Sequence, residues 1–107
     1  MQVSHENENG ITQIVIKGRL DAVTAPQADK LIKEAVEEEN IRLLFNLCDL
    51  EYISSAGLRL ILQTAKDVYE KGGQIVLCCS NENVRTILAS SQLSIAETVE
   101  AGIEALS

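Results

Sequence analysis

The sequence lacks the motifs on which most enzymes depend. It contains no glycine-rich phosphate loop, no GxSxG nucleophile elbow and no HExxH zinc motif. Its single histidine, His5, lies in a polar N-terminal segment, where a Ser-His-Asp relay is hard to assemble. Asp21 and Asp49 fall in different predicted loops, and no substrate pocket can be inferred around them. We therefore expect a protein that is not an enzyme and that carries no cofactor.

Long hydrophobic runs are also missing, so no segment could cross a membrane as a helix. The N-terminal residues MQVSHENENG have neither the basic start nor the apolar stretch of a signal peptide. These features predict a cytoplasmic protein without membrane insertion.

Basic residues are few. Nine Lys and Arg residues stand against 16 Asp and Glu residues, for a net charge of -7. Neutralising nucleic-acid phosphates requires clustered Lys and Arg, so we expect no direct contact with nucleic acid. The acidic balance suits a protein that meets a basic or mixed surface on another protein.

The cysteines are Cys48, Cys78 and Cys79, an odd count with one adjacent pair, which is a poor disulfide framework. They lack the spacing of metal ligands, and His5 is the only histidine that could complete a metal site. Each cysteine lies in or beside an apolar run, where Cys behaves as a small hydrophobic residue. We therefore predict structural cysteines and no metal site.

The length and composition of the chain predict one domain over residues 1–107. A length of 107 residues, with 46% hydrophobic and 23% charged residues, is typical of one globular unit. The segment 11–20 alternates as a strand that ends at Gly18, and a weaker strand over 2–7 precedes it. An Asn-Gly pair between them predicts a hairpin turn.

A helix is predicted over 24–40. Thr24 followed by Gln27 can form a reciprocal capping box at its start. The acidic residues 37–39 stand at the end of the helix where its dipole favours cations, so we interpret them as a solvated end. Apolar residues recur at three- and four-residue steps on one face, namely Ala28, Leu31, Ile32, Ala35 and Val36.

The next segments alternate between strand and helix. Residues 41–47 are apolar on both faces, as in a central strand covered by helices, and 48–54 are predicted to form a loop. A helix over 58–69 is stopped by the glycines 72–73, and a buried strand follows over 74–79. This order of strand, helix and strand predicts two parallel strands.

The last part of the chain has weaker patterns. A short helix is predicted over 81–91, capped by Ser80 or Asn81. Residues 93–98 could form a final edge strand, and 99–107 a terminal helix. The whole is a mixed α/β arrangement with no repeat and no linker.

Ser54 and Ser55 stand together where the loop gives way to the second helix. A Ser at a helix N-terminus can cap it by accepting a backbone N–H bond, and spacing alone favours this role. Alternatively it can accept a phosphate, which would find N–H donors and a positive dipole end already in place. One serine could cap while the other stays free, and Ala56 and Gly57 add little bulk nearby.

Several motifs resemble those of one family. GRLDAVTA (18–25), LLFNLCDLEYISSAGLRLIL (43–62) and KGGQIVLCC (71–79) occur in the order found in the bacterial anti-sigma factor antagonists, which are single STAS domains. The resemblance covers the whole chain, although the last thirty residues are less distinctive. It implies a four- to five-stranded mixed sheet with about four helices packed mainly on one face.

The resemblance also implies a function. The unmodified antagonist binds an anti-sigma factor that is also a serine kinase, and so frees the sigma factor for transcription. The kinase phosphorylates a serine of the antagonist and releases it, and a serine phosphatase restores the hydroxyl.

The family motif places the phosphorylated serine at Ser55, with Ser54 as the alternative acceptor. Ser54 occupies a place often held by Asp, and Ala56 a place where some members carry Ser or Thr. Asp21 matches an aspartate of the neighbouring loop. The implied partner-binding residues are Asp21, Ser54, Ser55, Ala56 and Gly57.

Two other functions stay open at this point. A STAS domain could instead be a subunit of a membrane transport or lipid-trafficking complex. A small nucleotide-binding or hydrolytic protein is a further alternative, although the missing phosphate loop counts against it. Ser55 could also be a helix-capping residue without any regulatory role.

Overall fold

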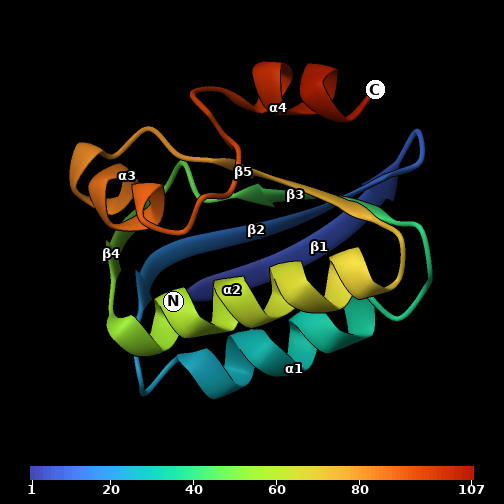
Figure 1. The fold of residues 1–107 in the computed structure, drawn as a ribbon. Helices are drawn as coiled ribbons and strands as arrows, with labels where there is room; N and C mark the ends of the chain where they lie inside the picture. Colours follow the sequence, from blue (N-terminus) through green and yellow to red (C-terminus); the bar gives the residue numbers. More distant parts are fainter.

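Six strands form one mixed sheet in the computed structural model, which describes residues 1–107 (Figure 1). Five strands follow the order β1-β2-β3-β5-β6, and β4 pairs with β2 outside this path. The β1–β2 pair is antiparallel and all other pairs are parallel. The strands are β1 (Gln2–Glu8), β2 (Ile11–Leu20), β3 (Arg42–Asn46), β4 (Leu50–Ile53), β5 (Gln74–Cys78) and β6 (Ile95–Ala96).

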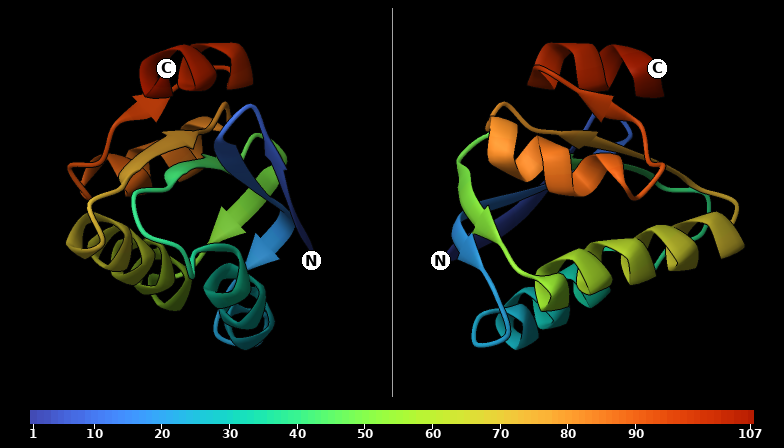
Figure 2. Two further views of the ribbon diagram at one scale, coloured as in Figure 1. Left: turned by 90° about the vertical axis from the view of Figure 1, so that its right-hand side faces the viewer. Right: turned by 60° about the vertical axis from the view of Figure 1, so that its left-hand side comes forward.

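Helices cover both faces of this sheet (Figures 1 and 2). Two long helices lie side by side on one face, a short one lies beside β4, and the last covers the opposite face. They are α1 (Ala25–Ala35), α2 (Ser55–Glu70), α3 (Glu82–Ala89) and α4 (Val99–Leu106). The predicted fold class, an α/β domain with a mixed sheet and about four helices mainly on one face, is confirmed, but the sheet has six strands and not four to five, because Leu50–Ile53 adds β4.

The larger core lies between the sheet and helices α1, α2 and α3, and it comprises 19 buried residues. The predicted stripe of α1 belongs here, with Ala28, Ile32 and Val36 buried. A smaller core of five buried residues lies under α4 and includes Leu44 and Val76. β3 therefore buries both of its faces, as its continuous apolar run predicts.

The N-terminal hairpin is confirmed. Asn9 and Gly10 both adopt positive φ, at 54° and 80°, as a two-residue turn between antiparallel strands requires. β1 is mostly exposed, so burial of its own side chains does little to fix how it pairs with β2. The turn therefore sets the register between the two strands.

The predicted end of β2 at Gly18 is wrong. Gly18 has a φ of 91°, and the register shifts between Gly18 and Arg19, so the strand continues to Leu20 through an irregularity. Before this point β2 pairs with β3, and after it β2 pairs with β4.

The predicted loop over 48–54 is also wrong in part, because Leu50–Ile53 forms β4. Only the two end residues of β4 are buried, with two exposed residues between them. This pattern breaks the alternation by which a strand is recognised from sequence.

Helix ends largely follow the predictions. Asn81 caps α3, where its Oδ1 accepts the N–H groups of Asn83 and Val84. Gly72, with a φ of 78°, follows the end of α2. The helix α1 stops at Ala35, however, so the acidic residues 37–39 lie beyond it and do not oppose its dipole.

Candidate functional site

The two serines lie at the junction between β4 and α2, and each has a different role. Ser54 is the N-cap residue, with extended backbone, and its Oγ accepts the Gly57 N–H at 3.3 Å. Its own backbone N–H donates to the carbonyl of Leu20 at 2.9 Å, which ties the junction to the end of β2. Ser54 is half-buried. Its hydroxyl is therefore committed to the helix cap.

Ser55 is the first residue of α2 and is exposed. Its hydroxyl has no hydrogen-bond partner within the chain. In the first turn of α2, the Leu58 N–H donates to the Ser54 carbonyl and the Gly57 N–H to Ser54 Oγ, while the N–H groups of Ser55 and Ala56 come too early in the helix to have intrahelical acceptors. The positive end of the helix dipole lies at the same place. Ser55 thus combines an accessible hydroxyl with surroundings that suit an anion.

Gly57 brings α2 close to β2. A Cβ atom at this position would lie 2.8 Å from the Leu20 carbonyl oxygen and 2.9 Å from Ile53 Cγ1. Gly57 is buried, so its role is to set the position of the serines. Ala56, in contrast, is half-exposed and lines a shallow hollow between the first turns of α1 and α2.

Asp21 organises the loop between β2 and α1. Its Oδ1 accepts the backbone N–H groups of Val23 and Thr24, at 3.0 and 3.1 Å. These bonds, chiefly that from Thr24, outweigh desolvation and lower the pKa of Asp21 below its ordinary value. The carboxyl group is therefore a fixed negative charge.

The predicted capping box of α1 is wrong. Thr24 does occupy the N-cap, but its side chain makes no cap hydrogen bond. Its Oγ1 instead accepts the Asp21 N–H and donates to the Arg19 carbonyl, both at 2.9 Å. The hydroxyl is used within the preceding loop, which leaves it unavailable to the helix.

The parallel pairing of β2 with β4 brings the Asp21 loop beside the serines. Arg19 is in register with Tyr52, and Leu20 with Ile53, so the two chains leave the sheet together. Asp21 and Ser54 are the next residues on each chain. The structure therefore brings together the site residues that the sequence singled out, with Gly57 beneath the surface.

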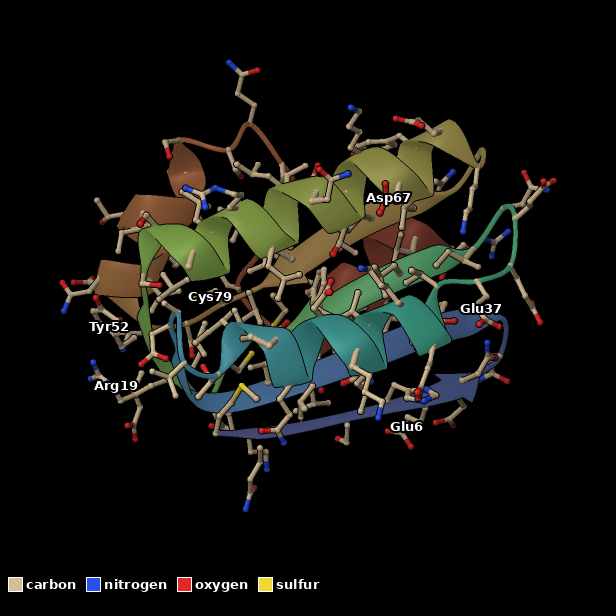
Figure 3. The ribbon with its side chains drawn as sticks, turned by 90° about the horizontal axis from the view of Figure 1, so that it is seen from below. Glu6, Arg19, Glu37, Tyr52, Asp67 and Cys79 are labelled. Atoms are coloured by element: carbon tan, nitrogen blue, oxygen red, sulfur yellow. The ribbon has the colours of Figure 1, made fainter.

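Sequence reasoning missed three exposed residues around this junction. The Arg19 guanidinium lies 4.2 Å from the centre of the Tyr52 ring, and Figure 3 shows the two side chains together near the start of α2. Tyr52 is 41% exposed and Val23 is 86% exposed. They were missed because their proximity depends on β4, a strand that the sequence did not reveal.

A second hollow, lined by polar residues, lies elsewhere in the molecule. This hollow, between the starts of α3 and α4, is lined by six polar residues that include Arg85, and Arg85 already pairs with Glu97 at 3.4 Å. No group of three or more His, Cys, Asp or Glu side chains is placed to hold a metal ion. None of the helices has the length and apolar character needed to span a bilayer.

Comparison with known proteins decides the family. The family model of the STAS domain matches residues 2–104. The chain belongs to the STAS domain family. This STAS domain is 30% identical over 91 residues to BtrV of Bordetella bronchiseptica, an alignment that covers 85% of the chain and 78% of BtrV. It is 28% identical over 94 residues to the anti-sigma F factor antagonist of Paenibacillus polymyxa, covering 87% and 80% of the two chains.

Solved structures confirm the fold. The crystal structure of an anti-sigma factor antagonist from Mycobacterium paratuberculosis superposes with a TM-score of 0.89 at 19% identity. The match covers 98% of this STAS domain and 92% of the mycobacterial chain.

Proposed function

We propose that this STAS domain is an anti-sigma factor antagonist that is switched by phosphorylation of Ser55. In its unmodified form it binds an anti-sigma factor that is also a serine kinase, and thereby regulates sigma-dependent transcription in the cytoplasm. The kinase phosphorylates Ser55 and releases the domain, and a serine phosphatase reverses the modification. The domain itself acts by binding, without catalysis. The observation that carries the proposal is the exposed, unbonded hydroxyl of Ser55 at the start of α2.

The division of roles between the serines supports Ser55 as the acceptor. Ser54 Oγ accepts a hydrogen bond from the Gly57 N–H, so phosphorylation of Ser54 would have to break the N-terminal cap of α2. Ser55 can be modified with the cap intact. Ser54, which stands where relatives often carry Asp, also keeps the capping function that an Asp side chain would serve.

The surroundings of Ser55 explain how one phosphate could act as a switch. The group adds a charge of about -1.5 to -2, and the end of α2 can tolerate that charge without refolding. At an interface the same group must lose its water, and the ionised Asp21 carboxylate in the neighbouring loop adds repulsion. If the phosphate makes the binding free energy less favourable by only ~3 kcal/mol, the affinity for the partner falls by more than 100-fold.

The exposed residues around Ser55 suit the centre of a protein interface. Val23 projects from the Asp21 loop, and Tyr52 presents an aromatic face beside Arg19. Tyr and Arg side chains are enriched among the residues that anchor protein contacts, and an exposed Val beside them adds apolar surface. The hollow beside Ala56 adds a concave element to the same surface. We define Val23, Tyr52, Ser55 and Ala56 as the docking surface.

Phosphate mapping tests this proposal. The full chain is incubated with its anti-sigma factor kinase and ATP, and the modified residue is located by peptide mass spectrometry. We expect one phosphate on Ser55, full modification of Ser54→Ala and none of Ser55→Ala. Phosphate on Ser54, or undiminished modification of Ser55→Ala, would overturn the assignment.

A further inference from the structure

Two of the three cysteines contact each other at the ends of neighbouring strands. Cys78 is the last residue of β5, and Cys48 follows the end of β3, which pairs with β5 in parallel. The Leu47 N–H donates to the Cys78 carbonyl at 2.8 Å and holds the two segments together. Their Sγ atoms are 2.7 Å apart, against about 2.05 Å in a disulfide. Bond formation therefore requires only a small movement.

The two thiols differ in accessibility. Cys78 is fully buried, in the smaller core beneath α4, whereas Cys48 is half-buried at the edge of that core. Desolvation, with a further contribution from the Cys48 contact, raises the pKa of Cys78 to about 12. Cys48 is thus the thiol that a dissolved reagent can reach first.

Cys79 lies on the other face of the sheet and is excluded from this pair. It belongs to the larger core, and its Sγ lies 3.6 Å from the Asn81 carbonyl oxygen. Figure 3, which views the molecule from the side of α1 and α2, shows Cys79 between these helices and the sheet. Adjacent residues of a strand point to opposite faces, so Cys79 cannot replace Cys78.

We propose that Cys48 and Cys78 form a redox pair that closes to an intramolecular disulfide when the protein meets a low-molecular-weight disulfide such as oxidised glutathione. This modification is independent of Ser55 phosphorylation. It would add a second, redox-sensitive input to the same small domain.

The reaction is two successive thiol–disulfide exchanges. The Cys48 thiolate attacks one sulfur of oxidised glutathione, forms a mixed disulfide and expels one glutathione thiolate. Cys78 then attacks Cys48 Sγ, the Cys48–glutathione bond breaks, and the Cys78 proton leaves with the second glutathione. The two protein thiols lose two electrons and two protons in total, and two molecules of reduced glutathione carry them. The contact between the sulfurs compensates for the low thiolate fraction of Cys78.

The disulfide would close a loop of the chain from residue 48 to residue 78. This loop contains β5 as well as β4 and α2, the elements that carry the phosphorylation site. Closing this segment restricts the unfolded chain more than the folded one. Oxidation should therefore raise the Tm of the protein, by roughly 10 °C for a domain of this size.

The test treats the full chain with oxidised glutathione and measures its intact mass without reduction. We expect a monomer that has lost two hydrogen atoms, with a disulfide linking tryptic peptides 43–59 and 72–85. Cys79→Ser is the matched control, and it should form the same disulfide and show the same rise in Tm. Cys48→Ser should show neither.

Several results would overturn the inference. If Cys79→Ser did not form the disulfide, Cys79 and not Cys78 would be the partner of Cys48, and the inference would be wrong. A wild-type product that stops at a glutathione adduct, or that forms only disulfide-linked dimers, would show that the pair does not close. Because peptide 72–85 contains both Cys78 and Cys79, fragmentation of the linked wild-type peptides between these two residues identifies the partner of Cys48, even if Cys48→Ser fails to fold.

Discussion

Ser54 and Ser55 are adjacent in the chain, yet only one of them contributes to the fold. The Ser54 hydroxyl satisfies the Gly57 N–H at the start of α2, while the Ser55 hydroxyl faces solvent. Sequence spacing suggested that one serine could cap and the other stay free, but it could not assign the roles. The assignment depends on the backbone of Ser54, which is extended with a ψ of 175° because β4 ends directly before it.

Ser54→Ala should therefore lower the free energy of unfolding by about 1 kcal/mol, the usual contribution of a capping hydroxyl. Urea denaturation monitored by circular dichroism measures the change. Ser55→Ala is the matched control and should leave stability within ~0.5 kcal/mol of the wild type. The cap assignment would be wrong if Ser55→Ala were the more destabilised variant.

Asp21 is the other residue whose environment makes a specific prediction. Its pKa is lowered in the folded state, so its charged form stabilises the fold at pH values above the ordinary carboxyl pKa of about 3.9. This stabilisation is lost as the pH falls through the lowered pKa. Asp21→Asn removes the charge and should bring the urea midpoint below that of the wild type at pH 7, with the difference shrinking towards pH 2.

Glu38→Gln is a suitable control because Glu38 is exposed and makes no ion pair or hydrogen bond. Its urea midpoint should follow the wild type across the same pH range. If the difference in urea midpoint between Asp21→Asn and the wild type stayed constant from pH 7 to pH 2, the charge of Asp21 would not contribute to the stability of the fold.

At the scale of elements, the strand–helix alternation was predictable because its signals are local. Apolar periodicity and glycine stops were sufficient for α1, α2 and β5, and the Asn-Gly turn for the hairpin. β4 was not predictable, because a four-residue strand buried only at its ends has no alternation. The continuation of β2 beyond Gly18 depends on β4 as its partner, so the two errors have one cause.

The close approach of α2 to β2 predicts an unusual outcome for Gly57→Ala. Glycine in a helix is generally about 1 kcal/mol less favourable than alanine. Here the added Cβ would lie 2.8 Å from the Leu20 backbone oxygen, and a strand backbone cannot easily move away. We expect Gly57→Ala to lose roughly 1–3 kcal/mol of unfolding free energy.

Urea denaturation also checks this substitution. Arg59→Ala, at an exposed position of the same helix, is the control and should stay within ~0.5 kcal/mol of the wild type. A gain in stability for Gly57→Ala would contradict the tight contact between α2 and β2.

At the scale of the whole molecule, the sheet separates two surfaces with different expected roles. The docking surface lies at the α1 and α2 side, around Ser55, and α4 covers the opposite face (Figure 2). The family resemblance predicted partner binding by Asp21, Ser54, Ser55, Ala56 and Gly57, and two of these residues, Ser55 and Ala56, belong to the docking surface. Val23 and Tyr52 could not be added from sequence, because the sequence did not reveal β4, whose pairing with β2 brings the loop after β2 next to the start of α2.

Val23→Asp should weaken binding of the anti-sigma factor kinase by about 10-fold or more, because it replaces an exposed apolar side chain with a charge that must lose its water on docking. Ile103→Asp is the matched control on α4, where Ile103 is 39% exposed. It should bind like the wild type in surface plasmon resonance. A greater loss for Ile103→Asp would place the interface on the other face.

In the proposed function, phosphate on Ser55 prevents docking without changing the fold. Isothermal titration tests this switch by comparing how the anti-sigma factor kinase binds the unmodified protein and the Ser55-phosphorylated protein at one ionic strength. We predict that phosphorylation raises Kd by more than about 100-fold while the circular dichroism spectrum stays the same. Equal affinities of the two forms would show that phosphate on Ser55 does not control docking.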